Sequence, residues 1–251
     1  MKRRTALGLL SSLVIPSAAD ASSPNRSAAA LGSCLPLLRV ESAGWGSVTG
    51  NLTLWLRDAV NAPWRRDGRG IPVILGRGGL RWGRGGHPIP RGAALKREGD
   101  GCSPAGIFEL DHAFGAGTAQ ETGVTRWSWV QMTPAHAGVD DSRSRHYNRI
   151  VDATRVKKDW ASAENMVPGS GVYRLGLVVR HNWQQRPQGG SCIFLHIRQG
   201  AGVPTSGCTA MTERAMKRVL TWLDAAKHPR LVQLPRAEWQ TCGPAWHLPV
   251  C

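Results

Sequence analysis

The sequence has 251 residues, with 32 lysines and arginines against 17 aspartates and glutamates, and a formal charge of +15. A hydrophobic fraction of 41% is enough to build a core, and a charged fraction of 20% is below that of typical disordered chains, so we expect a globular protein. The 30 glycines, 16 prolines and 11 tryptophans favour many short strands joined by turns and argue against an all-α fold.

An export signal is predicted at the N-terminus. Lys2, Arg3 and Arg4 precede an apolar run over residues 6–15, and the small-residue triplet Ala19-Asp20-Ala21 follows. This is the pattern of a secretory signal peptide, here residues 1–21. The run is too short to span a bilayer, and no other run of about 18 apolar residues occurs. We therefore expect a soluble protein in the periplasm, with no membrane span.

The expected mature chain keeps 29 positive and 16 negative side chains, so it remains strongly basic. Such a surface attracts polyanions, including the acidic polymers of a bacterial envelope. Export argues against nucleic acid as the partner, and the basic residues are scattered rather than interleaved with aromatic ones.

Six cysteines in an exported chain predict disulfides, whose connectivity cannot be read from the sequence. No CxxC, HxH or HExxH spacing occurs, so we expect no metal and no cofactor.

The organisation expected after the signal peptide is a flexible segment over residues 22–33 and one domain over residues 34–251. Short apolar runs bounded by glycine and proline predict strands, and the glycine-dense residues 76–101 are predicted to form turns and hairpin tips. Apolar residues at helical spacing predict an amphipathic helix over residues 212–226, capped by Thr212. The fold class is therefore mostly β, a sandwich or mixed sheet with one or two helices. The predicted strands are residues 35–40, 51–56, 72–75, 105–110, 173–180 and 191–197.

The segment from Ser191 to Thr209 contains the candidate chemistry. A β-rich run ends at His196, a loop of eleven residues follows, and Cys208 comes after Gly207 near the start of the predicted helix. A histidine within reach activates a thiol, glycine leaves room for a substrate carbonyl, and backbone N–H groups can bind an oxyanion. A buried cysteine in a turn is more often structural, so this pair alone does not establish catalysis.

This segment resembles the L,D-transpeptidase catalytic domain, a family that remodels bacterial peptidoglycan. The family pattern is a histidine at the end of a strand, a loop, and then Ser or Thr, any residue, Gly and Cys, which here is His196 and Thr205-Ser206-Gly207-Cys208. The hairpin from Lys96 to Phe108, with Glu98 and Gly-Asp-Gly, also looks like that of the family. Further matches to its periplasmic branch are residues 76–83, Tyr147-Asn148 and 162–164.

The resemblance implies a fold like that of these domains and a role for each candidate residue. Cys208 is the nucleophile, His196 its base, Gly207 the glycine beside it, and Ser206 a candidate for orienting the imidazole. Many members carry an arginine two residues after the nucleophile, and this chain does not, so Arg198 is a candidate substitute for binding a substrate carboxylate. The remaining substrate-binding candidates are Tyr147, Asn148, Thr205 and Thr209.

The function implied by the resemblance is acyl transfer on peptidoglycan stem peptides through a thioester, in cell wall biogenesis and cell shape. The cut after stem residue one or three stays open. Carbapenem-type β-lactams are the expected inhibitors. Two alternatives remain: a hydrolase of the L,D-carboxypeptidase or amidase type on the same peptides, and a non-catalytic wall-binding protein. For a histidine-assisted thiol we expect activity to rise with pH between about 5 and 9.

Overall fold

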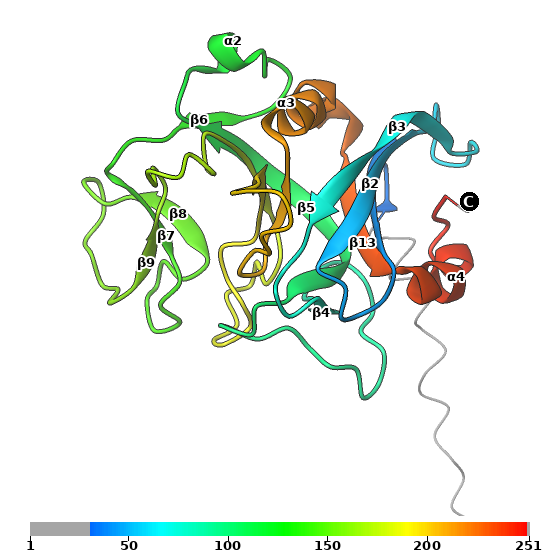
Figure 1. The fold of residues 1–251 in the computed structure, drawn as a ribbon, viewed down its shortest axis with the longest axis horizontal. Helices are drawn as coiled ribbons and strands as arrows, with labels where there is room; N and C mark the ends of the chain where they lie inside the picture. The colour runs from blue at the N-terminus through cyan, green and yellow to red at the C-terminus, as the bar shows by residue number, and fades with distance from the viewer. Residues whose placement is uncertain (1–30, 250–251) are drawn as a thin grey trace, which may run out of the picture.

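Eight strands close into a barrel that forms the body of the protein. The computed structural model describes residues 31–249 (Figure 1). Its strands pair in the order β10, β11, β12, β3, β2, β1, β13 and β5, and β5 returns to β10. The prediction of a mostly β fold is confirmed. The barrel strands are β1 (Pro36–Ser42), β2 (Thr49–Leu56), β3 (Arg65–Ile74), β5 (Ser103–Gly115), β10 (Leu175–Val179), β11 (Phe194–Ile197), β12 (Thr209–Met211) and β13 (Arg230–Pro235).

The length of β5 explains how the sheet closes. A strand of 13 residues extends about 43 Å, so its middle pairs with β13 over residues 106–109 and its far part pairs with β10 over residues 110–115. Two short strands, β4 (Leu80–Trp82) and β6 (Trp129–Gln131), run parallel to the start and end of β5.

Strand β4 corrects one expectation. It lies within residues 76–101, which were predicted to contain only turns and hairpin tips. That prediction is wrong for residues 80–82, because Leu80 and Trp82 are buried on one side of the strand while Arg81 between them is exposed.

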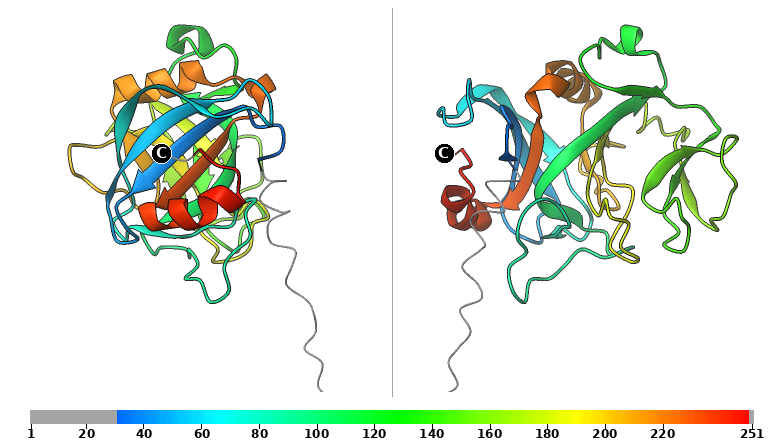
Figure 2. Two further views of the ribbon diagram at one scale, coloured as in Figure 1. Left: turned by 90° about the vertical axis from the view of Figure 1, so that its right-hand side faces the viewer. Right: turned by 180° about the vertical axis from the view of Figure 1, so that it is seen from behind.

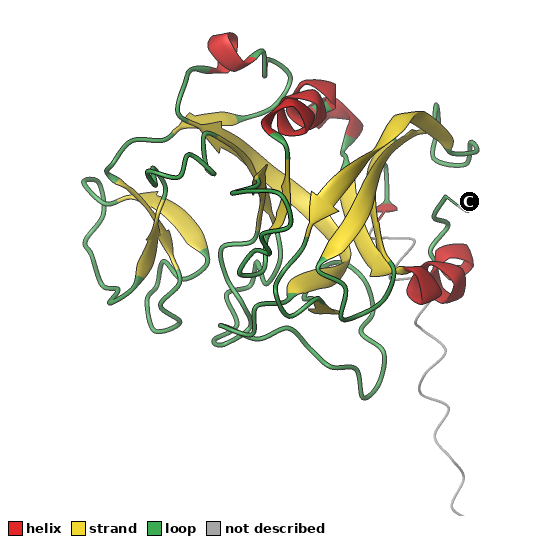
Figure 3. Cartoon of the chain, viewed as in Figure 1, coloured by secondary structure: helices red, strands yellow, loops and turns green. Residues whose placement is uncertain are grey.

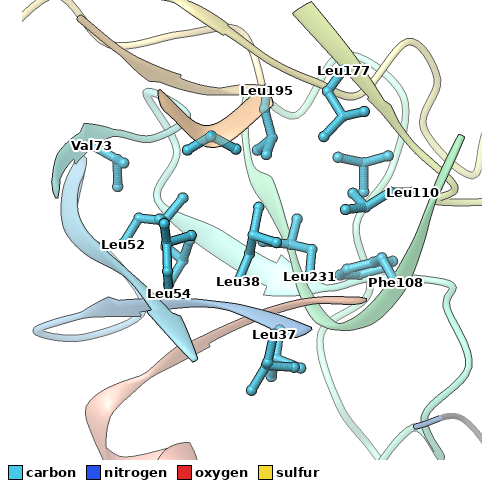
Figure 4. Close-up of a cluster of buried hydrophobic side chains, with 14 of the residues drawn as sticks. Leu37, Leu38, Leu52, Leu54, Val73, Phe108, Leu110, Leu177, Leu195 and Leu231 are labelled. Carbon is cyan, nitrogen blue, oxygen red and sulfur yellow. The ribbon is translucent and has the colours of Figure 1, made fainter. Parts of the chain in front are cut away.

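Aliphatic side chains fill the barrel. Leu38, Leu54 and Leu195 are at most 1% exposed and converge there from three different strands (Figure 4). Leu37 lies on the other side of β1 and is also fully buried, because helix α4 covers that part of the sheet. Side chains that alternate along β1 therefore point in turn into the barrel and onto its outer face, and the apolar ones on the outer face are buried by a helix.

Helices are few and lie outside the barrel (Figure 3). Helix α3 (Glu213–Trp222) packs against β10 and β11, and α4 (Arg236–Ala245) packs against β1 and β13 on the opposite side (Figure 2). As predicted, Thr212 caps α3, by accepting a hydrogen bond from the Ala215 N–H. The helix ends earlier than expected, and a 3-10 turn, η1 (Ala225–Lys227), follows; α2 (Ala119–Thr122) is a single turn.

A second, three-stranded sheet lies beside the barrel and was not predicted. It consists of β7 (His136–Val139), β8 (Arg149–Asp152) and β9 (Ala163–Asn165). A separate apolar cluster joins Met166, next to β9, to outward-facing barrel side chains such as Phe194 and Val178. Cys208 belongs to this cluster, so the candidate site lies on the outside of the barrel.

The expected disulfides are absent among the described residues. Cys34, Cys102, Cys192, Cys208 and Cys242 are free thiols. The prediction is wrong for these five because each thiol has another hydrogen-bond partner. The Cys34 and Cys102 thiols, for example, donate to the carbonyl oxygens of Pro36 at 2.9 Å and Gly78 at 3.1 Å. Cys251, the signal peptide at residues 1–21 and the segment up to residue 30 lie outside the described residues. Within residues 31–249, every helix is too short or too polar to cross a bilayer.

Candidate active site

Two neighbouring parallel strands present His196 and Cys208 on one face. In the register of β11 and β12, His196 lies opposite Ala210, and Cys208 directly precedes β12. Side chains alternate along a strand, so Cys208 and Ala210 share a face, as do Phe194 and His196. The N–H of Phe194 donates to Cys208 Sγ at 3.3 Å, which fixes the sulfur against β11.

A cavity of about 520 Å³ opens over these two side chains. Its volume is in the range of small-molecule sites and admits a peptide segment. Both His196 and Cys208 are 7% exposed and lie in its wall. The polar and ionisable residues that line the cavity are Arg77, Lys96, Glu98, Asp140, Glu164, Ser170, Tyr173, Ser191, Cys192, His196, Gln199, Thr205, Ser206 and Cys208.

The imidazole of His196 is held in one tautomer. Its Nδ1 lies 2.8 Å from the carbonyl oxygen of Ile197, and because a carbonyl can only accept, Nδ1 carries the proton. The other nitrogen, Nε2, is therefore a free base. Tyr173 packs edge-on against the ring at a centroid distance of 5.3 Å. Burial lowers the pKa of His196 to about 4, against which the Ile197 hydrogen bond acts, so the ring is neutral at physiological pH.

The thiol of Cys208 is also neutral at rest. Burial, and then the negative charge of Glu164, raise its pKa to about 12, while the Phe194 N–H and Lys96 act in the opposite direction. The S–H group donates to the carbonyl oxygen of Cys192 at 3.4 Å. The shifts of both pKa values therefore favour a neutral thiol and a neutral imidazole over a resting thiolate–imidazolium pair.

The loop before the cysteine is fixed by its own hydrogen bonds. Thr205 Oγ1 donates to the Cys208 carbonyl oxygen at 2.6 Å and accepts from the Gly207 N–H at 3.1 Å. Ser103 Oγ donates to the same carbonyl oxygen at 2.9 Å. Gly207 has a φ of +148°, a conformation that side chains other than glycine rarely adopt.

Charged side chains complete the wall. Lys96 is 3% exposed and pairs with Asp100 at 2.9 Å. Glu98 accepts hydrogen bonds from the hydroxyls of Tyr147 and Ser191. Glu164 accepts from the Tyr173 hydroxyl, which ties the three-stranded sheet to the residue that packs on His196.

Some of these wall residues were missed as site residues by the sequence reasoning. Lys96, Glu98, Glu164 and Arg77 lie in segments that resemble the L,D-transpeptidase family, and this resemblance could have marked them as site residues. Tyr173 was noted only as the start of a predicted strand.

The structure brings together the predicted Cys208, His196, Ser206, Gly207 and Thr205, which all line the cavity. Ser206 does not orient the imidazole, because its Oγ accepts from Arg77 at 3.0 Å and the carbonyl oxygen of Ile197 holds the ring instead.

Four predicted substrate-binding residues do not line the cavity. Thr209 follows Cys208 and so points to the other face, where its hydroxyl bonds Gln233 at 2.7 Å. Tyr147 is 1% exposed and lies behind Glu98. The side-chain amide of Asn148 is hydrogen-bonded to backbone groups of His181 and Cys192. Arg198 follows β11, and its backbone N–H donates to the carbonyl oxygen of Met211 in β12. In this structure Thr209, Tyr147 and Asn148 support the scaffold around the cavity, and substrate contact by these residues and Arg198 stays a prediction.

In residues 31–249 no group of three or more His, Cys, Asp and Glu side chains is arranged to hold a metal ion.

No family model and no curated protein matches this chain. Among solved structures, it is similar to the crystal structure of the helical cell shape determining protein Pgp2 from Campylobacter jejuni, with 12% identity and a TM-score of 0.41. The match covers 84% of this chain and 55% of that one, so the chain spans about half the length of the structure it matches. A likeness this low does not identify a function.

Proposed function

We propose that this protein is a periplasmic L,D-transpeptidase, a cysteine acyltransferase that acts on peptidoglycan stem peptides. One observation carries the proposal: a free thiol, Cys208, and a neutral imidazole with an available Nε2, His196, share one face of two adjacent strands in a peptide-sized cavity. The resemblance of the loop from His196 to Cys208 to the L,D-transpeptidase pattern supports this substrate class.

Acylation begins when His196 Nε2 takes the proton of Cys208 as the sulfur attacks the carbonyl carbon of an L-configured stem residue. The bond to the D-configured residue then breaks, and the imidazolium gives its proton to the leaving amine. The product is a thioester on Cys208. The amine of a neighbouring stem, or of a free D-amino acid, then attacks the thioester and gives a proton to His196 Nε2; the carbon–sulfur bond breaks, and His196 passes that proton to the sulfur.

The protonation states determine the timing of the proton transfer. With the pKa of Cys208 near 12 and that of His196 near 4, a separated ion pair is costly before substrate binds. Proton transfer therefore accompanies formation of the carbon–sulfur bond. For this transfer the S–H group turns away from the Cys192 carbonyl oxygen, to which it donates at rest, and towards Nε2.

The backbone supplies a donor for the developing oxyanion. The Gly207 N–H is engaged by Thr205, whereas the Cys208 N–H has no hydrogen-bond partner among residues 31–249. That N–H is the available oxyanion donor in this loop. Lys96, also in the cavity wall, adds positive charge near the reacting sulfur.

Muropeptide turnover tests the proposal. The protein would be incubated with a disaccharide tetrapeptide, with and without an excess of a free D-amino acid, and the products resolved by mass spectrometry. We expect a product that has exchanged its terminal D-residue only when the acceptor is present. Cys208→Ala is the control and should give none. A trimmed stem in both conditions would favour the hydrolase, and no product from either would contradict catalysis.

A further inference from the structure

A second cavity, of about 260 Å³, shares no residue with the candidate active site. It lies where the ends of β10 and β13 meet β5. Its charged lining consists of Arg84, Arg180 and Arg230 against a single carboxylate, Glu109. The cavity therefore carries an excess of positive charge in a concave surface, which concentrates anions.

Glu109 does not balance these arginines. Its carboxylate accepts from Arg180 at 2.7 Å and from Arg230 at 3.3 Å. The guanidinium of Arg84 makes no hydrogen bond or ion pair with any residue in 31–249. In addition, the Nε–H groups of Arg84 and Arg180 are buried without an acceptor. Buried donors without partners are costly, so both arginines are held at a cost, and the terminal nitrogens of Arg84, which no residue in 31–249 engages, can donate to an acceptor from outside the chain.

A fourth arginine concentrates charge at the same place. Arg149 stacks on Trp183 with its guanidinium carbon 3.6 Å from the ring centroid, and Arg180 lies 4.5 Å from the same ring. Burial lowers the pKa of Arg149, attraction by Asp111 opposes this, and repulsion by Arg180 adds to it. Arg149 and Arg180 are thus packed against one ring, that of Trp183, which lines the cavity, so Arg149 adds positive charge beside it.

The hollow continues into a neighbouring cavity of about 480 Å³, which shares Glu109, Arg180 and Arg230 and adds His228 and the pair of Asp111 with His112, whose Oδ2 and Nδ1 lie 3.0 Å apart. A ligand longer than one anionic group can therefore extend from the first cavity into the second.

We propose that the cavity around Arg84 and Arg180 is an oxyanion-binding site, separate from the acyl-transfer site, for a carboxylate or phosphate group carried on a chain. A guanidinium fork satisfies either group with two parallel hydrogen bonds. The site does not depend on chemistry at Cys208, so it stands or falls separately from the proposed function.

Titration with acetate and with inorganic phosphate, at constant ionic strength, tests this site. The readout is the set of arginine Nε–Hε signals in nuclear magnetic resonance spectra of the ¹⁵N-labelled protein. We expect saturable shifts that weaken about tenfold in Arg84→Gln, the size expected for losing one charge-assisted hydrogen bond. Arg91→Gln is the matched control, because Arg91 is exposed and outside the cavity, and it should leave the affinity unchanged.

The two probes identify the source of the group. Saturation by acetate alone indicates a carboxylate ligand, and saturation by phosphate alone indicates a phosphate ligand. Arg84→Lys keeps the charge without the fork and should bind with intermediate affinity, which guards against misfolding of Arg84→Gln. Absence of saturable shifts, or equal weakening in Arg84→Gln and Arg91→Gln, would overturn the proposal.

Discussion

Replacing Asn148 by alanine tests whether this residue supports the site rather than binding substrate. Its side-chain NH₂ donates to the carbonyl oxygens of His181 and Asn182 at 2.8 and 2.9 Å, and its own carbonyl oxygen accepts from the Cys192 N–H at 3.0 Å. The substitution therefore leaves three backbone groups without this partner in the protein interior.

The expected loss of stability follows from these contacts. Each buried backbone group left without a partner costs about 1–3 kcal/mol, and relaxation recovers part of that for three groups that are close together. Asn148 also has a φ of +60°, which asparagine tolerates and which costs alanine about 1 kcal/mol more. We expect Asn148→Ala to lower the free energy of unfolding by about 4 kcal/mol.

Urea unfolding of the two proteins measures this difference. Asn61→Ala is the control, because Asn61 is exposed and its loss should change stability by less than about 0.5 kcal/mol. A loss below about 1 kcal/mol for Asn148→Ala, together with a raised KM for the stem peptide, would refute the reasoning and restore Asn148 as a substrate contact.

Two further predictions concern pH. The rate of Cys208 acylation should be level from about pH 6 to 9 and should fall only as His196 is protonated near pH 4. This profile differs from the rise between pH 5 and 9 expected from the sequence. A fall in the stopped-flow acylation rate with a midpoint near pH 6.5 would contradict it. Burial lowers the pKa values of His87, His181 and His196 to about 4, 3 and 4, so their contribution to stability is full above the unfolded value of 6.5 and is lost as pH falls towards 4. Together the three histidines should lower the free energy of unfolding by about 5 kcal/mol when the pH is lowered from 7 to 5. A urea unfolding midpoint that is the same at both pH values would rule this out.

The sequence predicted elements whose signal is local. Helix α3 has apolar residues at helical spacing and a capping threonine, and strands β1 and β2 are short apolar runs between turn residues, so each was placed within a few residues. The closure of the barrel was not predictable, because it depends on which distant strands pair: β5 meets β10 some sixty residues later in the chain. The β7–β9 sheet is half-buried and lacks a strong apolar run, so it gave no comparable signal.

The candidate site divides in the same way. Cys208 and His196 were found because both lie in one segment with a recognisable spacing. Thr209 was predicted as a substrate contact, although the alternation of side chains along a strand places it on the opposite face from Cys208. The part played by Tyr173 and Glu164 requires knowing that the three-stranded sheet packs over β11, and the sequence alone did not contain that arrangement.

Intact-protein mass after incubation with a carbapenem tests the central claim most directly. The account predicts one covalent adduct on the wild-type protein and none on Cys208→Ala. Cys192→Ala removes the other thiol in the cavity wall and should still be labelled. An adduct on Cys208→Ala equal to that on the wild type, or no adduct on any of the three proteins, would contradict a nucleophilic role for Cys208.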